Sequence, residues 1–267
     1  MPDESTPLRR LGFLTLGLFD EADPRAGHES TLQVIELGEQ LGFDSAWLRH
    51  RHLQFGISSP VAVLAAASQR TSRIELGTAV TPLGWENPLR LAEDWATVDL
   101  LSGGRLNPGL SVGPPMRWDK VRDALYPSSA DVEDFSYARV ERLLSYLAGE
   151  PATSQNAGTE GFEVFSDRVQ PYSPGLRARM WYGAGSLRSA RWAGEHAMNL
   201  LSSSVVFAEP GGASKILQGV TTDVLGEHTS GGPHQGLLKA RTVQVKDQTF
   251  YTPFTPAKLP AAKVAFE

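Results

Sequence analysis

Apolar runs of strand length alternate with stretches of helical periodicity along most of this chain. Strand candidates begin near residues 11, 44, 74 and 105, so the pattern repeats about every 30 residues. One strand and one helix with their loops have about this length, and strands joined by a helix run parallel. The pattern therefore predicts a parallel sheet covered by helices, either a closed (β/α)8 barrel or an open doubly wound sheet.

Residues 74–111 form the clearest unit, which is predicted to be strand, helix, turn and strand. Asn87 is placed to cap the helix, and Pro88 occupies the first turn, where its missing N–H costs nothing. Ser102-Gly103-Gly104 would end the helix in the left-handed conformation that glycine tolerates. One apolar helix face is predicted from Leu91, Trp95, Val98 and Leu101.

The other elements follow from the same two periods. Further strands are predicted at 11–19, 43–48, 180–183 and 198–201. Further helices are predicted from Ser30 or Thr31 to Gly42, from Ser59 to about residue 70, from Ser136 to Leu147, and from Ser186 to about Gly194. The first of these helices is expected to bury Val34, Ile35, Gly38 and Leu41. Residues 116–134 show no clear period.

The rhythm of strand and helix stops at about Ser202, and glycine and proline become frequent beyond it. A short strand at Val243, Val245 and Phe250 is the regular element expected there. We therefore divide the chain into a barrel portion at 1–207 and an irregular segment at 208–267. An insertion containing a hairpin is expected at about 151–175. A barrel needs eight strands, so this one either closes through the irregular segment or is incomplete after the sixth strand.

Composition narrows the class of protein. The chain has 267 residues, is 41% hydrophobic and carries a net charge of −5, so no basic surface favours nucleic acid. It has no cysteine, which excludes disulfides and thiolate chemistry and fits a reducing compartment. No apolar run approaches the roughly 20 residues of a membrane span. We expect a cytoplasmic protein with no membrane and no nucleic-acid partner.

A glycine-containing turn, Gly183-Ala184-Gly185-Ser186, lies between a predicted strand and a predicted helix. Backbone N–H groups at a helix N-terminus form a ready phosphate site, and the hydroxyl of Ser186 could add a donor. A phosphate site at the carboxyl end of a strand is also typical of barrel enzymes. The alternative is an ordinary tight turn that Ser186 caps.

Two histidines, His50 and His52, follow the second strand in a loop that also carries Arg49 and Arg51. Barrel active sites are built at this end of the strands, and a histidine with a pKa near neutral could act as general acid or base. We expect His50 and His52 to be catalytic, His50 in preference. The alternatives are surface residues or a cluster that attracts an anionic substrate or cofactor phosphate. No spacing typical of a metal site is present, and we expect no metal.

Several blocks resemble the bacterial luciferase-like flavin monooxygenases. Their signature of a helix followed by Asp-x-Leu-Ser-Gly-Gly-Arg is matched by residues 99–105. The segments LGFDSAW, SRIELGTAV, NPLRLAEDWATVD and MWYGAGSLRSARWAGEH resemble further blocks of the family in the same order. The resemblance covers about residues 10–205. Many members have Glu-His-His after the second strand, where this chain has Arg49-His50-Arg51-His52, and nothing after about residue 207 resembles the family.

The resemblance implies a (β/α) barrel enzyme that uses reduced FMN and oxygen to oxygenate a small organic substrate. It implies that the cofactor lies against Thr78, Ala79 and Gly113 and that Gly183, Gly185 and Ser186 hold its phosphate. A separate flavin reductase and a second copy of the chain are candidate partners.

Three other functions stay open. One is an oxidoreductase that uses the deazaflavin F420 on the same scaffold. The second is a non-catalytic flavin-binding protein or a truncated fragment, and the third is a phosphate-handling barrel enzyme unrelated to flavin.

Overall fold

The computed structural model describes residues 10–154, 157–202, 222–226, 237–245 and 248–257, with side chains up to residue 201. Its larger sheet has five parallel strands in the order β11-β1-β2-β3-β5. These are β1 (Arg10–Thr15), β2 (Ser45–Leu48), β3 (Glu75–Thr78), β5 (Leu106–Asn107) and β11 (Thr222–Gly226). β2 is buried at every position, as a parallel strand covered on both faces must be.

A second parallel sheet continues the same layer in the order β10-β9-β6-β4. Its strands are β4 (Thr81–Pro82), β6 (Gly109–Ser111), β9 (Trp181–Ala184) and β10 (Asn199–Ser202). The two sheets meet where the extended strand is interrupted, between β3 and β4 and between β5 and β6. There the Thr78 hydroxyl donates to the carbonyl of Gly109 (2.7 Å) and accepts from its N–H (3.0 Å). A Cβ at Gly109 would lie 2.2 Å from the Thr78 carbonyl oxygen, so this close approach requires glycine.

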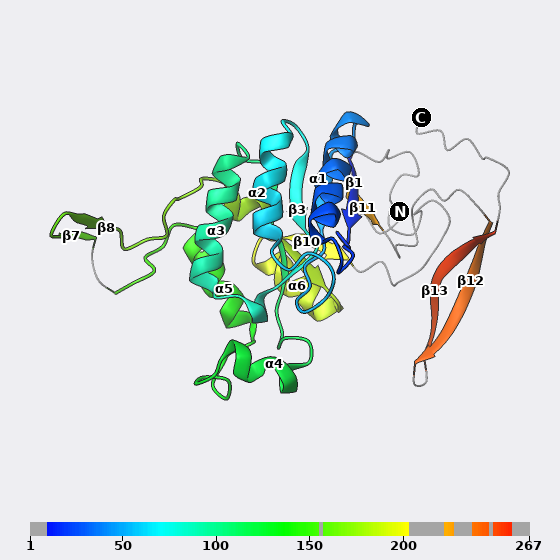
Figure 1. Ribbon diagram of the computed structural model, residues 1–267. Helices are drawn as coiled ribbons and strands as arrows, with labels where there is room; N and C mark the ends of the chain where they lie inside the picture. The colour runs from blue at the N-terminus through cyan, green and yellow to red at the C-terminus, as the bar shows by residue number, and fades with distance from the viewer. Residues whose placement is uncertain (1–9, 155–156, 203–221, 227–236, 246–247, 258–267) are drawn as a thin grey trace.

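Helices alternate with the strands and cover the sheet. They are α1 (Pro24–Gln40), α2 (Pro60–Arg70), α3 (Pro88–Leu101), α4 (Trp118–Leu125), α5 (Tyr137–Leu147) and α6 (Leu187–Glu195). α1, α2, α3 and α5 pack side by side in this order (Figure 1). As predicted, Asn87 caps α3 by accepting from Leu89 and Arg90, and Ser136 caps α5 by accepting from Ala138.

This arrangement confirms the predicted fold class, a parallel (β/α) barrel that is incomplete over the described residues. All six predicted strands are present, and β11 adds a further parallel strand beside β1. β10 and β11 are edge strands within the described part of the chain. No helix described here combines the length and apolar character that a bilayer span requires.

Some local predictions were wrong. α1 begins at Pro24 rather than at residue 30, because Asp23 caps it by accepting from the Ala26 N–H. α1 buries Ile35 and Gly38, but Val34 is 41% exposed, and Leu41, like Leu101 at the end of α3, is more than half exposed. Leu41 and Leu101 lie at or beyond the last turn, where the helix no longer faces the sheet.

The helix α4 was missed, because its eight residues supply one buried apolar side chain, Val121, and thus no readable period. Beyond residue 202 the sequence predicted one short strand, whereas three are present in the described residues, β11 and the two strands of a hairpin. β12 (Leu237–Val245) and β13 (Gln248–Ala257) form an antiparallel hairpin that stands apart from the barrel in Figure 1. The predicted hairpin of the insertion is present as β7 (Gly158–Glu160) and β8 (Glu163–Phe165). The division at residue 207 stays a prediction.

The signature segment at 99–105 is structural. Asp99 is fully buried and pairs with Arg179 rather than with Arg105. Its carboxylate accepts from Arg179 Nη2 (2.6 Å), Ser173 Oγ (2.5 Å) and the Leu106 N–H (3.2 Å), and thereby joins α3 to the segment before β9. Arg105 instead donates to backbone carbonyls at the end of α2 and the start of β3, namely Ser68, Thr71 and Ile74.

Candidate active site

His50 lies just after β2 and is only 2% exposed. Its Nε2 is 3.0 Å from the Ser58 carbonyl oxygen. Because a carbonyl only accepts, Nε2 must carry the hydrogen, and Nδ1 is left as a bare acceptor. Nδ1 is buried without a hydrogen-bond partner among the described residues. His50 therefore offers an unused lone pair.

The environment of His50 keeps the ring neutral. Burial lowers its pKa to about 3, and the nearby charges of His52 and Arg51 act in the same direction. The carboxylate of Glu86, 3.8 Å from Nε2, therefore faces a neutral ring rather than an imidazolium. The near-neutral pKa expected from sequence is not what the fold produces, so His50 at neutral pH can accept a hydrogen bond but is not a ready proton donor.

His52 packs between His50 and Trp85. Its ring centroid is 4.5 Å from that of His50, and it stacks on Trp85 at 4.1 Å with an interplanar angle of 13°. Its Nε2 is also buried without a described partner, and burial lowers its pKa. The stack fixes both rings, so their unused nitrogens have defined directions.

These rings line a cavity of about 380 Å³, which we call the histidine pocket. A volume of this size suits a small organic molecule. The pocket is formed by the loop after β2, the turn after β4 and the segment that follows β6. Its lining residues are His50, Arg51, His52, Leu53, Gln54, Pro82, Trp85, Pro114, Met116, Arg117 and Val121.

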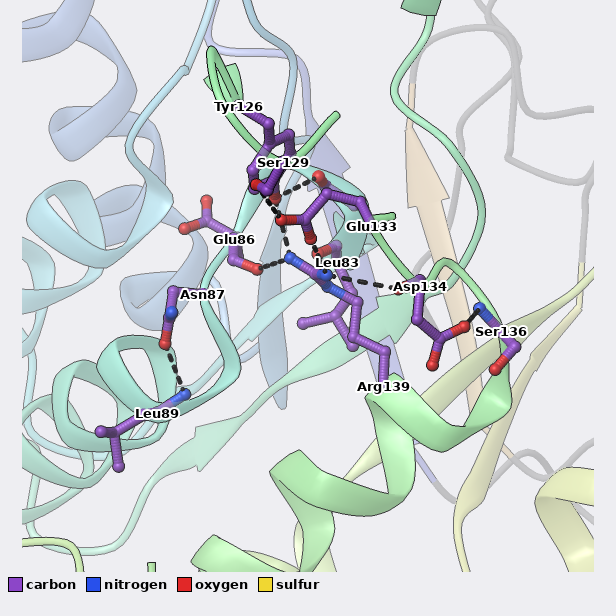
Figure 2. Close-up of polar contacts among 11 residues, drawn as sticks. Leu83, Glu86, Asn87, Leu89, Tyr126, Ser129, Glu133, Asp134, Ser136 and Arg139 are labelled. Carbon is purple, nitrogen blue, oxygen red and sulfur yellow. Dashed lines mark hydrogen bonds and ion pairs between the residues drawn. The ribbon is translucent and has the colours of Figure 1, made fainter. Parts of the chain in front are cut away.

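Arg139 of α5 binds the turn from Leu83 to Glu86 (Figure 2), which carries the pocket residue Trp85. Arg139 is 3% exposed and donates to the carbonyls of Leu83 (3.2 Å) and Glu86 (2.8 Å). It also donates to Tyr126 Oη (2.7 Å) and Glu133 Oε2 (3.0 Å). The turn that carries Trp85 is thus tied to α5. Sequence reasoning missed Arg139, although its spacing from the buried apolar residues of α5 places it on the same helix face.

The predicted cofactor-binding residues of β3 and β6 lie at the same edge of the barrel. Thr78 is fully buried, and its hydroxyl is already engaged with Gly109. Ala79 is half-buried, and its N–H donates to the Leu48 carbonyl. Gly113 has a φ of +152°, and a Cβ built on it meets nothing within 4 Å. The backbone at Gly113 is therefore open to approach, whereas Thr78 has a clear structural task.

The glycine turn after β9 has the predicted form. Ser186 caps α6 in a capping box with Ser189: each side chain accepts from the other residue's N–H, at 3.2 and 3.1 Å. A Cβ at Gly183 would lie 2.7 Å from Val80 Cγ1, so its lack of a side chain serves packing. Gly185 and Ser186 are exposed.

The fold brings His50 and His52 against Trp85, a contact that the sequence did not predict. It places Gly113 and Ser186 at the same carboxyl edge of the strands, but no described hydrogen bond or ring contact joins them to the histidines. His50, His52 and Glu86 offer ligand atoms within 4.8 Å of one another. The expectation that the protein uses no metal stays a prediction.

A family model described as luciferase-like monooxygenase matches residues 10–218. The chain belongs to this family. Among its relatives, 4-hydroxyprotoasukamycin monooxygenase of Streptomyces nodosus subsp. asukaensis is 36% identical over 93 residues, which are 34% of this chain and 25% of the relative. The F420-dependent glucose-6-phosphate dehydrogenase of Amycolatopsis mediterranei is 28% identical over 178 residues, or 63% of this chain and 51% of the relative. The chain thus spans a quarter to about half of these relatives' length.

Among solved structures, the oxygenating constituent of 3,6-diketocamphane monooxygenase from Pseudomonas putida, in complex with FMN, has a similar fold. The TM-score is 0.55 at 15% identity, over 72% of this chain and 57% of that chain. At this identity the likeness concerns the fold alone. It agrees with the barrel of parallel strands described above.

Proposed function

We propose that the protein is a flavin-dependent monooxygenase that uses reduced FMN and oxygen on a small organic substrate. The observation that carries this proposal is membership of the luciferase-like monooxygenase family over most of the chain. Relatives named as monooxygenases and the FMN complex of a protein with this fold support it. The histidine pocket at the carboxyl edge of the strands has room for such a substrate.

The first turn of α6 fits a phosphate group. The N–H groups of Leu187 and Arg188 have no acceptor among the described residues, while Ser186 and Ser189 cap each other. The positive end of the helix dipole and the exposed Arg188 favour an anion at this place. Leu187, Arg188 and Gly185 would hold the phosphate through backbone N–H groups.

Bound flavin would supply the activation of oxygen, and the chain would bind, orient and exclude water. His50 Nδ1 and His52 Nε2 would direct a polar group of the substrate, because both nitrogens are buried and unused. Trp85 and Pro82 would shield that group from solvent. We extend the proposal to a cytoplasmic location, a separate flavin reductase and a homodimer.

An F420-dependent oxidoreductase is the second candidate, because the Amycolatopsis relative that matches the larger share of this chain is named as F420-dependent. Titration of the purified chain with FMN, reduced FMN and F420, followed by calorimetry, distinguishes the two. Tighter binding of F420 and turnover without oxygen would replace the monooxygenase proposal. Absence of binding to all three at high micromolar concentration would refute both.

The variant Ser186→Asp tests the phosphate site, since aspartate is also a good N-cap and leaves the helix intact. Its negative charge should repel the phosphate and weaken FMN binding at least about tenfold, as the loss of one charge-assisted hydrogen bond does. Ser136→Asp, at the cap of α5, is the matched control and should leave FMN affinity unchanged. Equal FMN affinity in Ser186→Asp and the wild type would show that the phosphate lies elsewhere.

A further inference from the structure

The histidine pocket is lined by two arginines, Arg51 and Arg117, and by no acidic side chain. Glu86, 3.8 Å from His50 Nε2, lies outside its lining. Within the described residues, neither guanidinium forms a hydrogen bond or an ion pair, and Arg51 Nε is buried. The pocket is therefore basic although the chain as a whole has a net charge of −5.

Most guanidinium groups that the fold buries or half-buries have acceptors within the described residues. Arg105 and Arg139 have several each, and Arg177 and Arg179 donate to the His196 carbonyl and to Asp99. Arg51 and its neighbour Arg49 are half-buried without such an acceptor in that part of the chain. Arg51 has lost hydration without gaining an acceptor: burial lowers its pKa, and the charge of Arg49 acts in the same direction. A buried charge normally requires a partner, so the missing partner of Arg51 is best supplied by a ligand.

Most of the rest of the lining of the histidine pocket is apolar and suits the apolar part of a small molecule. Trp85 and Pro82 form one side, and Leu53 and Met116, which are 80% and 56% exposed, stand at the mouth. Large apolar side chains that are this exposed around a cavity commonly mark a binding site. The unused nitrogens of His50 and His52 add fixed polar contacts inside.

We propose that the histidine pocket binds an organic anion, a small molecule whose apolar body packs on Trp85 and whose carboxylate or phosphate binds Arg51 and Arg117. Guanidinium groups bind such oxygen pairs through two parallel hydrogen bonds. The identification of this anion as the substrate rests on the proposed function; the binding itself does not.

The probes are 2-naphthoate and its uncharged analogue 2-naphthylmethanol, titrated calorimetrically into the full chain without flavin. Naphthoate should bind at least about tenfold more tightly, which is the effect of one charge-assisted hydrogen bond. Arg51→Gln and Arg117→Gln should each reduce this preference several-fold and leave the affinity for the alcohol unchanged. Arg117 is exposed, so its variant is expected to fold normally. Arg25→Gln, an exposed arginine on α1, is the control and should keep the full preference.

Two results would overturn the proposal. The first is equal affinity for naphthoate and the alcohol, or a preference that survives in both arginine variants. The second is that Arg51→Gln weakens binding of FMN but not of riboflavin, which would assign the guanidinium to the cofactor phosphate. Failure of the proposed function is separate, because it would remove flavin binding and leave the preference for naphthoate intact.

Discussion

Replacement of Arg139 by methionine should cost about 3–5 kcal/mol of the free energy of unfolding, as does breaking a buried ion pair by removal of one partner. Methionine keeps the apolar stem within α5 and removes the guanidinium. Glu133, 18% exposed at its side chain, then loses its cation, and the carbonyls of Leu83 and Glu86 lose their donors.

A sum over single bonds would overstate this cost. Arg139 has five acceptors, the four named above and the Asp134 carbonyl (3.2 Å). At about 1.5–3 kcal/mol for each charge-assisted bond they give roughly 7–15 kcal/mol, which is the gross value. Tyr126 and Glu133 lie near the surface and can take up water once Arg139 is gone, which lowers the net value. The ring contacts of the guanidinium with Phe135 and Tyr126 (5.6 and 5.8 Å to the centroids) contribute as well.

Urea unfolding followed by tryptophan fluorescence measures the effect. Arg90→Met is the matched control, because Arg90 is also a helix residue with acidic partners, Glu93 and Asp94, but is 67% exposed at its side chain. Exposed pairs of this kind contribute about 0.3–0.5 kcal/mol. A loss of less than about 1 kcal/mol in Arg139→Met would show that the network of Figure 2 stabilises the fold no more than a surface pair.

Two further predictions follow from the buried groups. Asp99→Ala should lower the free energy of unfolding by about 3–5 kcal/mol, since it leaves Arg179 and Ser173 without their acceptor. The control is Asp94→Ala at an exposed position. Equal urea midpoints of the two variants would refute the role of Asp99. The pKa of His50 lies below the ordinary 6.5, so its stabilising effect is complete above pH 6.5 and is lost as the pH falls toward about 3. From pH 7 to pH 5 the wild type should therefore lose about 2 kcal/mol more stability than His50→Asn, and parallel pH profiles would contradict this.

Local sequence patterns were sufficient to predict features that depend only on residues within one helix or turn. Asn87 and Ser136 could be identified as caps because capping involves only the next few N–H groups. The same holds for the turn at Ser186, whose partner Ser189 lies three residues along the chain. The helix α4 could not be found this way, because a helix that buries one apolar side chain leaves no period to detect.

The contacts that make the site come from distant segments. Asp99 and Arg105 are neighbours in sequence, yet Asp99 pairs with Arg179 across 80 residues. His52 meets Trp85, and Arg139 meets Leu83 across 56 residues. Side-chain spacing within one element carries no information on such partners, since they are set by which helices and loops the barrel brings together.

The sequence by itself determined the order of strands and helices and the parallel course of the strands, because these depend on periods and on strands joined by helices. The periods left a closed barrel and an open sheet as alternatives, and the barrel, with the edge at which its site lies, followed from the resemblance to the luciferase-like family. Only the tertiary structure decided the chemical state of that site. Burial by loops from three parts of the chain makes His50 neutral and leaves Arg51 without an acceptor. Desolvation is a property of the assembled fold, and no residue carries it alone.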